Sequence, residues 1–199
     1  MPESPPLVTQ AIAAAQRLGF PLTRQDTGGA ASLPDVGRFL AMLAAGCTGS
    51  RATGGQTTGG RIGELGTGTG IGAAWMVSAM PADCRLVTVE RDEGRAQAAR
   101  DLFAHDPRVE VITGDAIGVM SSLGPFDLLF ADCGAAGTDL VSWLTLGGRI
   151  VNDDVTPRKV LPEDSPFLTD DPKRRFFFGD PRLVSAEVAR IYSKPRARQ

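Results

Sequence analysis

The stretch that most constrains the fold of this chain is 61–72, which reads R-I-G-E-L-G-T-G-T-G-I-G. A short apolar run ends in an acid, Glu64, and glycines then stand at every second position: Gly66, Gly68 and Gly70. Glycine lets the backbone approach a ligand closely and adopt conformations that a side chain disfavours. The residues A-A-W-M-V that follow continue as a helix, whose first N–H groups have no partner within the helix. A strand, a tight turn and a helix in this order predict the first unit of a nucleotide-binding α/β sheet.

After this unit, apolar runs typical of strands alternate with helical patterns to about residue 155. We expect strands at 62–65, 86–89, 109–112, 127–131 and 149–151. We expect helices between them at 71–80, 93–103, 116–123 and 138–144. Strands that are separated by helices of this length form parallel, doubly wound sheets. The predicted fold is therefore a doubly wound, mostly parallel α/β sheet of the Rossmann-like kind.

The segments that flank this core differ from it in composition. Apolar residues recur with a helical period over 7–18 and again over 34–46, so two N-terminal helices are expected. The Gly- and Thr-rich stretch 47–60 is predicted to be a flexible connection to the core. Beyond residue 155 the chain is irregular and proline-rich, with a basic and aromatic run at 173–178 and a candidate last strand at 183–188.

Length and composition fit a single soluble domain over residues 1–199. We divide it into an N-terminal part at 1–60, a cofactor-binding core at 61–155 and a substrate or interface segment at 156–199. The net charge of −2 gives no general attraction to nucleic acid or to an anionic membrane. No apolar run has the length of a transmembrane helix, and the N-terminus lacks the pattern of a signal peptide. Three scattered cysteines indicate free thiols, and a cytoplasmic location is expected.

Acidic residues stand at the ends of five successive predicted strands. The carboxyl ends of parallel strands meet at one edge of the sheet, where ligands bind in doubly wound folds. Aspartates at such positions also cap helices and form turns, but folding does not require six carboxylates at one edge. We therefore predict a ligand site at this edge from the acids Glu64, Glu90, Asp115, Asp132, Asp153 and Asp154.

Two classes of cofactor compete for the glycine-rich turn. From Gly68 the chain reads G-T-G-I-G-A, which satisfies the dinucleotide pattern G-x-G-x-x-A, with Glu90 near the position of a ribose-binding acid. From Glu64 it reads E-x-G-x-G-x-G, the pattern of class I S-adenosylmethionine-dependent methyltransferases. A carboxylate before the glycines suits a cationic aminoacyl group and repels a pyrophosphate, and Asp115 suits an adenine amino group. These two acids favour S-adenosylmethionine over a dinucleotide.

Longer motifs resemble one family more specifically. The segments E-L-G-T-G-T-G, V-T-V-E, G-D-A, F-D-L-L-F-A-D and G-G-R-I-V-N-D-D-V are similar to motifs of the cation-dependent O-methyltransferases of the catechol and caffeoyl-CoA type. The segment S-L-P-D-V-G-R-F-L-A-M-L also resembles the helix before the first strand of that family. The resemblance covers about residues 30 to 155. It implies transfer of a methyl group from S-adenosylmethionine to a hydroxyl of a small molecule.

The resemblance also implies roles for individual residues. Glu90 would take the ribose hydroxyls, and Asp115 would meet the adenine. Mg²⁺ or Mn²⁺ would be bound by Asp132, Asp153 and Asp154, since oxygen ligands suit these ions. The cation would lower the pKa of the acceptor hydroxyl, with Asp132 as the catalytic residue. The full set implied at the cofactor is Glu64, Gly66, Thr67, Gly68, Gly70, Glu90, Arg91, Asp115, Ala116 and Asp132.

The chain departs from the pattern of this family at two positions of the site. Asp154 stands where the family has Asn, and Ala135 stands where it usually carries a Lys that acts as a base. Two alternatives therefore stay open beside a small-molecule acceptor: a modified nucleoside in tRNA, which the basic run at 173–175 would contact, and a non-catalytic protein that binds S-adenosyl ligands. A homodimer through the Phe-rich C-terminal segment is a further expectation.

Overall fold

The computed structural model describes residues 4–20, 22, 34–49, 59–133, 135, 137–153 and 161–188 of the chain. They belong to two compact units, which divide between residues 153 and 154. That boundary lies close to the predicted start of the C-terminal segment, and the prediction of a single domain stays a prediction. Within the described ranges, no helix has both the length and the apolar character needed to cross a membrane.

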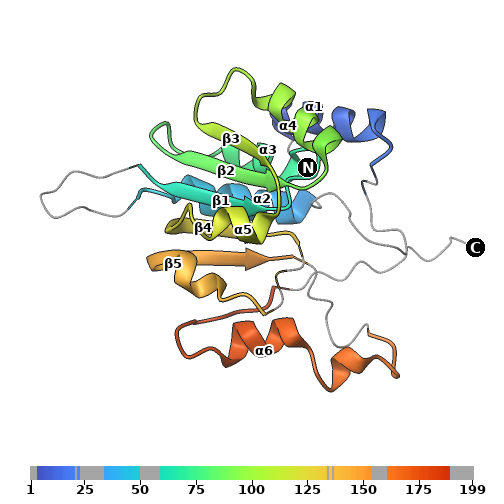
Figure 1. The fold of residues 1–199 in the computed structure, drawn as a ribbon, viewed down its shortest axis with the longest axis vertical. Coiled ribbons are helices and arrows are strands. Elements are labelled where there is room, and N and C mark those ends of the chain that lie inside the picture. Colours follow the sequence, from blue (N-terminus) through green and yellow to red (C-terminus); the bar gives the residue numbers. More distant parts are fainter. Residues whose placement is uncertain are drawn as a thin grey trace, which may run out of the picture. The chain divides into compact units, whose positions relative to one another are not determined.

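The first unit is built on a five-stranded sheet with the order β3-β2-β1-β4-β5 (Figure 1). Its strands are β1 Arg61–Leu65, β2 Arg85–Glu90, β3 Val109–Thr113, β4 Phe126–Ala131 and β5 Leu144–Asn152. All neighbouring strands are parallel. The strand order reverses at β1, so the connections that follow β1 and β4 leave in opposite directions and open a crevice between them. The predicted α/β fold is confirmed, and the expected ligand edge lies at this crevice.

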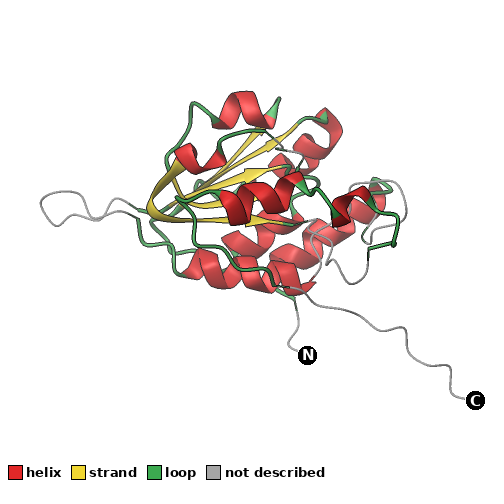
Figure 2. Ribbon diagram, turned by 90° about the horizontal axis from the view of Figure 1, so that it is seen from below, coloured by secondary structure: helices red, strands yellow, loops and turns green. Residues whose placement is uncertain are grey.

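Helices cover both faces of the sheet (Figure 2). They are α1 Pro6–Arg17, α2 Pro34–Ala45, α3 Ile71–Val77, α4 Glu93–Phe103 and α5 Ala116–Met120. Helices α1 and α2 pack against α3, which is buried at every residue. The core on that face contains apolar side chains at paired positions of three adjacent strands, Ile62, Leu86 and Leu128. Burial of this apolar surface holds the helices on the sheet.

Most predicted elements lie within three residues of their expected ends, and the strand expected at 149–151 lies within β5, but the helix predicted at 138–144 is wrong. In place of a helix at 138–144 there is a short 3₁₀ helix, η1 Leu140–Trp143. Strand β5 begins directly after it, at Leu144, and continues through Gly147 to Asn152. Gly147 has a φ of 79°, and the pairing of β5 with β4 shifts in register beside it. A glycine in this conformation lets a strand bulge without ending.

The second unit contains a helix that the sequence analysis missed. Among residues 161–188 the structure has a 3₁₀ turn, η3 Pro166–Leu168, and an α-helix, α6 Pro172–Gly179. Asp171 caps α6, because its side chain accepts hydrogen bonds from the N–H groups of Lys173 and Arg174. An Asp followed by a Pro at the first helical position is a recognised start signal, so this helix was predictable.

The predicted last strand at 183–188 is wrong, since the structure gives these residues no strand. One of them contacts α6 instead, since Glu187 forms an ion pair with Arg174 of that helix. Arg174 also forms an ion pair with Asp171. Arg174 is buried by these contacts. The basic run at 173–175 is therefore not a uniformly exposed basic patch, which weakens the argument for RNA contact at this segment.

Candidate active site

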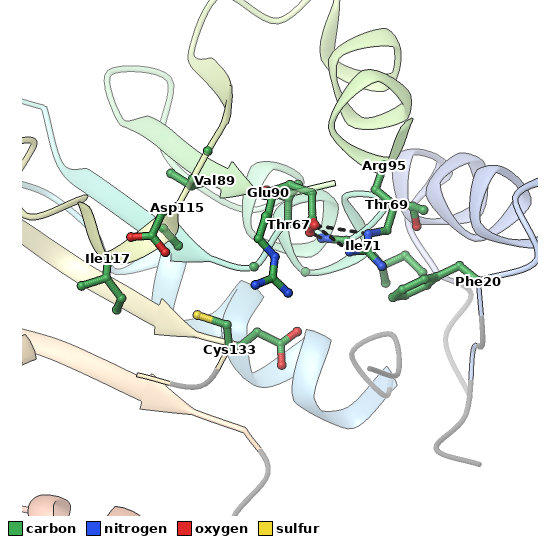
Figure 3. Close-up of a pocket in the computed structure, with 17 residues that line it drawn as sticks. Phe20, Thr67, Thr69, Ile71, Val89, Glu90, Arg95, Asp115, Ile117 and Cys133 are labelled. Carbon is green, nitrogen blue, oxygen red and sulfur yellow. Dashed lines mark hydrogen bonds and ion pairs between the residues drawn. The ribbon is translucent and has the colours of Figure 1, made fainter. Parts of the chain in front are cut away.

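A cleft of about 490 Å³ opens at the carboxyl ends of β1 to β4, within the first unit (Figure 3). Eight of the ten residues predicted to meet the cofactor line it: Gly66, Thr67, Gly68, Glu90, Arg91, Asp115, Ala116 and Asp132. The structure therefore brings residues from four strand ends into one cavity. Two predicted residues, Glu64 and Gly70, do not line it. Contact of any of these residues with a cofactor stays a prediction.

The glycine-rich turn forms one wall of the cleft. Gly66 has a φ of 94°, and a Cβ on it would lie 2.9 Å from the carbonyl oxygen of Asp132. Gly68 has a φ of 53° and lines the cleft. Gly70 faces away from the cleft, since a Cβ there would lie 3.1 Å from the ring of Phe103 on α4. The first two glycines shape the cleft, whereas Gly70 allows helix packing.

Glu64 is buried, and its carboxylate contacts side chains of the sheet and does not line the cleft. The hydroxyl of Thr88 donates to Glu64 Oε2 at 2.6 Å, and the hydroxyls of Thr88 and Thr67 are hydrogen-bonded to each other. Burial raises the pKa of Glu64 to about 8, although the bond from Thr88 acts in the opposite direction. Thr67 lines the cleft and Glu64 does not, and contact of Glu64 with an aminoacyl group stays a prediction.

Glu90 ends β2 and is almost fully buried at the floor of the cleft. Its Oε2 accepts the N–H of Gly68 at 2.8 Å, and its Oε1 accepts the N–H of Asp92 at 2.9 Å. Arg95 forms an ion pair with Oε1, at 2.8 Å from Nη2. The ring of Phe20 lies over the guanidinium of Arg95, 5.4 Å from its centroid (Figure 3). Arg95 and Phe20 thus enclose the acid from the side of α4 and α1.

Asp115 follows β3 and has a structural role as well as a place in the cleft. Its Oδ2 accepts the N–H of Gly118 at 2.7 Å, which caps α5. The next two residues, Ala116 and Ile117, line the cleft beside it. An apolar wall beside a carboxylate is suited to a flat heterocycle with an exocyclic amino group.

The proposed metal ligands lie at the ends of β4 and β5. Ala131 pairs with Asn152, so Asp132 and Asp153 both follow directly after paired residues of adjacent strands. Asp132 lines the cleft, whereas Asp153 does not. Asp154 lies outside the described residues. No group of three or more potential ligands is present in the part of the chain that the structure describes. The metal site therefore stays a prediction with two oxygen donors side by side in register.

Sequence reasoning missed several cleft residues, among them Phe20, Thr69, Arg95 and Cys133. Thr69 and Cys133 are neighbours of predicted residues and could have been included on that ground. The buried Oγ1 of Thr69 has no hydrogen-bond partner among the described residues. Phe20 comes from the segment after α1 and Arg95 from the first turn of α4, so no local motif connects either with the glycine-rich turn.

Known proteins similar to this chain are methyltransferases. A family model described as a methyltransferase domain matches residues 64–156. A catechol O-methyltransferase of Niastella koreensis is 33% identical over 146 residues, which are 66% of this chain and 62% of that protein. The chain spans between 46% and 69% of the length of the first curated relatives that it matches.

Solved structures agree with the fold. The O-methyltransferase TomG of Streptomyces achromogenes, which takes part in tomaymycin synthesis and was solved in complex with S-adenosylmethionine, is 25% identical with a TM-score of 0.61. The match covers 82% of this chain and 72% of TomG. An O-methyltransferase of Bacillus cereus, solved with S-adenosylhomocysteine, has a TM-score of 0.64 and 23% identity, and the match covers 90% and 81% of the two chains.

Proposed function

Since the chain belongs to the class I S-adenosylmethionine-dependent O-methyltransferases, in the family of catechol and caffeoyl-CoA type enzymes, we propose that it transfers a methyl group from S-adenosylmethionine to a hydroxyl of a small molecule. One observation carries the proposal most directly. The glycine-rich turn, Glu90 and Asp115 come from three different strand ends and line one cleft. Their order along the chain matches the pattern that the sequence shares with this family.

The cleft fits S-adenosylmethionine by shape and by polar groups. Its 490 Å³ volume lies within the range of small-ligand sites. The missing Cβ at Gly66 keeps the turn close to the end of β4. Glu90 would accept ribose hydroxyls, and Asp115 would accept the adenine amino group through the oxygen that does not cap α5. When bound, S-adenosylmethionine supplies a methyl group on a positively charged sulfur.

We further propose that a divalent cation binds between the ends of β4 and β5. Asp132 and Asp153 would hold it, with Asp154 as a third donor, because carboxylates at paired strand ends suit Mg²⁺ or Mn²⁺. When bound, such an ion lowers the pKa of a hydroxyl ligand. Because Ala135 stands at the usual position of the basic Lys, the chain itself offers no amine there. Asp132 would then orient the acceptor at the cleft wall beside the methyl donor.

Isothermal titration calorimetry tests these steps separately. The full chain is titrated with S-adenosylhomocysteine, then with catechol in the presence and absence of Mg²⁺. We expect S-adenosylhomocysteine to bind without metal, and catechol to bind only when Mg²⁺ is present. Binding of S-adenosylhomocysteine with no effect of Mg²⁺ on catechol would remove the metal site and keep the cofactor site. Absence of S-adenosylhomocysteine binding would overturn the proposed function. If NAD bound more tightly than S-adenosylhomocysteine, the cleft would belong to the dinucleotide-binding class.

The matched variants are Asp132→Asn and Asp153→Asn, which keep size and remove charge. Both should abolish the Mg²⁺ effect on catechol binding, whereas Asp153→Asn should leave S-adenosylhomocysteine binding within about twofold, because Asp153 does not line the cleft. Binding of S-adenosylhomocysteine without methyl transfer to catechols, flavonoids or tRNA would favour the non-catalytic alternative.

A further inference from the structure

Three residues that line the cleft contact one another, and we call them the Glu90 clasp: Glu90, Arg95, which lies five residues further along the chain, and Phe20 from the segment after α1. Arg95 donates to Glu90 Oε1 from Nη2 at 2.8 Å and from Nε at 3.2 Å. The guanidinium carbon of Arg95 also lies over the ring of Phe20, 5.4 Å from the ring centroid. Figure 3 shows the three side chains together at the glycine-rich turn.

The two oxygens of Glu90 are unequal in this arrangement. Oε1 accepts the N–H of Asp92 and hydrogen bonds from Nε and Nη2 of Arg95. Among the described residues, Oε2 accepts only the N–H of Gly68. A carboxylate has about four acceptor positions, two on each oxygen. Oε1 is therefore saturated, and the remaining acceptor capacity of Glu90 lies on Oε2, next to the glycine-rich turn.

Arg95 is held on Oε1 by more than one contact. The Glu90 side chain is only 7% exposed and that of Arg95 is 34% exposed, so the pair is partly shielded from water. Hydrogen bonds between charged groups are stronger than neutral ones, and an aromatic face adds a further attraction for the guanidinium. A ligand that displaced Arg95 from Glu90 would have to break its ion pair with Glu90 and its contact with the ring of Phe20.

We propose that Arg95 stays on Oε1 when the cofactor binds, so that Glu90 recognises one ribose hydroxyl through Oε2, where the family resemblance implies both. Arg95 is then the residue that determines how this chain reads the ribose. The inference rests on the proposed function, because it takes the adenosyl cofactor as the ligand of the cleft.

The test compares S-adenosylhomocysteine with its 2′-deoxy and 3′-deoxy analogues by titration calorimetry on the full chain. In the wild type we expect one analogue to bind at least about tenfold more weakly than S-adenosylhomocysteine, and the other to stay within about threefold. Arg95→Ala frees Oε1, so both analogues should then bind about tenfold more weakly than S-adenosylhomocysteine. Arg95→Lys keeps a donor for Oε1 and should keep the asymmetry of the wild type.

Arg100→Ala is the matched control, because Arg100 lies on the same helix, pairs with Glu93 and does not line the cleft. It should show the wild-type pattern, and circular dichroism reports whether each variant is folded.

Two results in the wild type would overturn the inference. Equal weakening of both analogues would show that Arg95 leaves Oε1. Equal affinity for all three ligands would show that Glu90 does not recognise the ribose. If Arg95→Ala does not fold, the wild-type asymmetry alone decides. Absence of S-adenosylhomocysteine binding would overturn the proposed function itself, which is a different result from symmetric binding.

Discussion

Gly66 lies where the turn after β1 passes closest to the end of β4. A Cβ at this position would stand 2.9 Å from the backbone oxygen of Asp132, and the φ of 94° already disfavours any other residue. Gly66→Ala should lower the free energy of unfolding by about 1–3 kcal/mol and weaken S-adenosylhomocysteine binding at least about tenfold, because the turn must move away from the cleft. Urea unfolding and titration calorimetry measure the two effects.

The variant Gly147→Ala is the control for Gly66→Ala. It has the cost of a side chain at positive φ but no close contact like that between Gly66 and Asp132. Gly147 also has a positive φ, 79°, but no atom of the described residues lies within 4 Å of its Cβ position. We expect this variant to lose about 1 kcal/mol of stability and to bind S-adenosylhomocysteine like the wild type. Equal loss of binding in the two variants would contradict the role given to the contact between Gly66 and Asp132.

Glu64 makes stability depend on pH through its buried carboxyl group. Because burial raises its pKa to about 8, the folded state holds a proton between about pH 4.5 and pH 8 that the unfolded state releases. Its contribution to stability is therefore full below the unfolded pKa and is lost as the pH rises through the folded pKa. Glu64→Gln, which resembles the protonated acid, should gain stability relative to the wild type by up to about 1.4 kcal/mol per pH unit across this range.

Urea unfolding of both proteins from pH 5 to pH 8 gives this difference. Glu110→Gln, at an exposed acid on β3, is the control and should show no such slope. A stability difference between Glu64→Gln and the wild type that does not change with pH would show that Glu64 is ionised in the folded protein.

At the scale of the element, α5 depends on Asp115 both as a cap and as a cleft residue. Its Oδ2 caps the helix, so Asp115→Ala should cost about 1 kcal/mol of stability and also weaken S-adenosylhomocysteine binding. Asp115→Asn should keep the cap, since asparagine is an equally good capping residue. Its amide oxygen would then bond the N–H of Gly118, and its NH₂ group would face the adenine amino group, donor against donor.

Thermal unfolding and calorimetry on the two variants distinguish these roles. Asp115→Asn should be as stable as the wild type yet bind S-adenosylhomocysteine about tenfold more weakly. Wild-type affinity in Asp115→Asn would mean that Asp115 only caps α5, the role that its hydrogen bond with Gly118 gives it.

For the molecule as a whole, every described residue that lines the cleft belongs to the first of the two compact units. Ligand that binds only the folded state adds about 2.7 kcal/mol of stability at a hundredfold excess over Kd. Saturating S-adenosylhomocysteine should therefore slow hydrogen–deuterium exchange in residues up to 153 and leave 161–188 unchanged. Slower exchange within α6 would contradict this and would tie the second unit to cofactor binding. The homodimer and the cytoplasmic location stay predictions at this scale.

Much of the first unit was determined by local sequence. The strand–turn–helix at Arg61–Val77 followed from glycine conformations and apolar runs, and α4 has the predicted bounds, Glu93–Phe103, because its cap and period are both local. The helix expected at 138–144 failed, since the bulge at Gly147 lets β5 begin early and takes up Leu144. Helix α6 was missed although its Asp-Pro start was present in the sequence.

Local sequence was enough to predict the class of the fold, the edge of the sheet where the acids lie and the residue types of the glycine-rich turn. Which of these residues face the cleft depends on contacts between elements that are distant along the chain. Glu64 is buried and accepts a hydrogen bond from the hydroxyl of Thr88, and a Cβ on Gly70 would meet Phe103. The Glu90 clasp likewise joins the segment after α1 with β2 and α4. Backbone conformation and periodicity depend on neighbours along the chain, whereas the direction and partners of a side chain at a strand end depend on residues that only folding brings together.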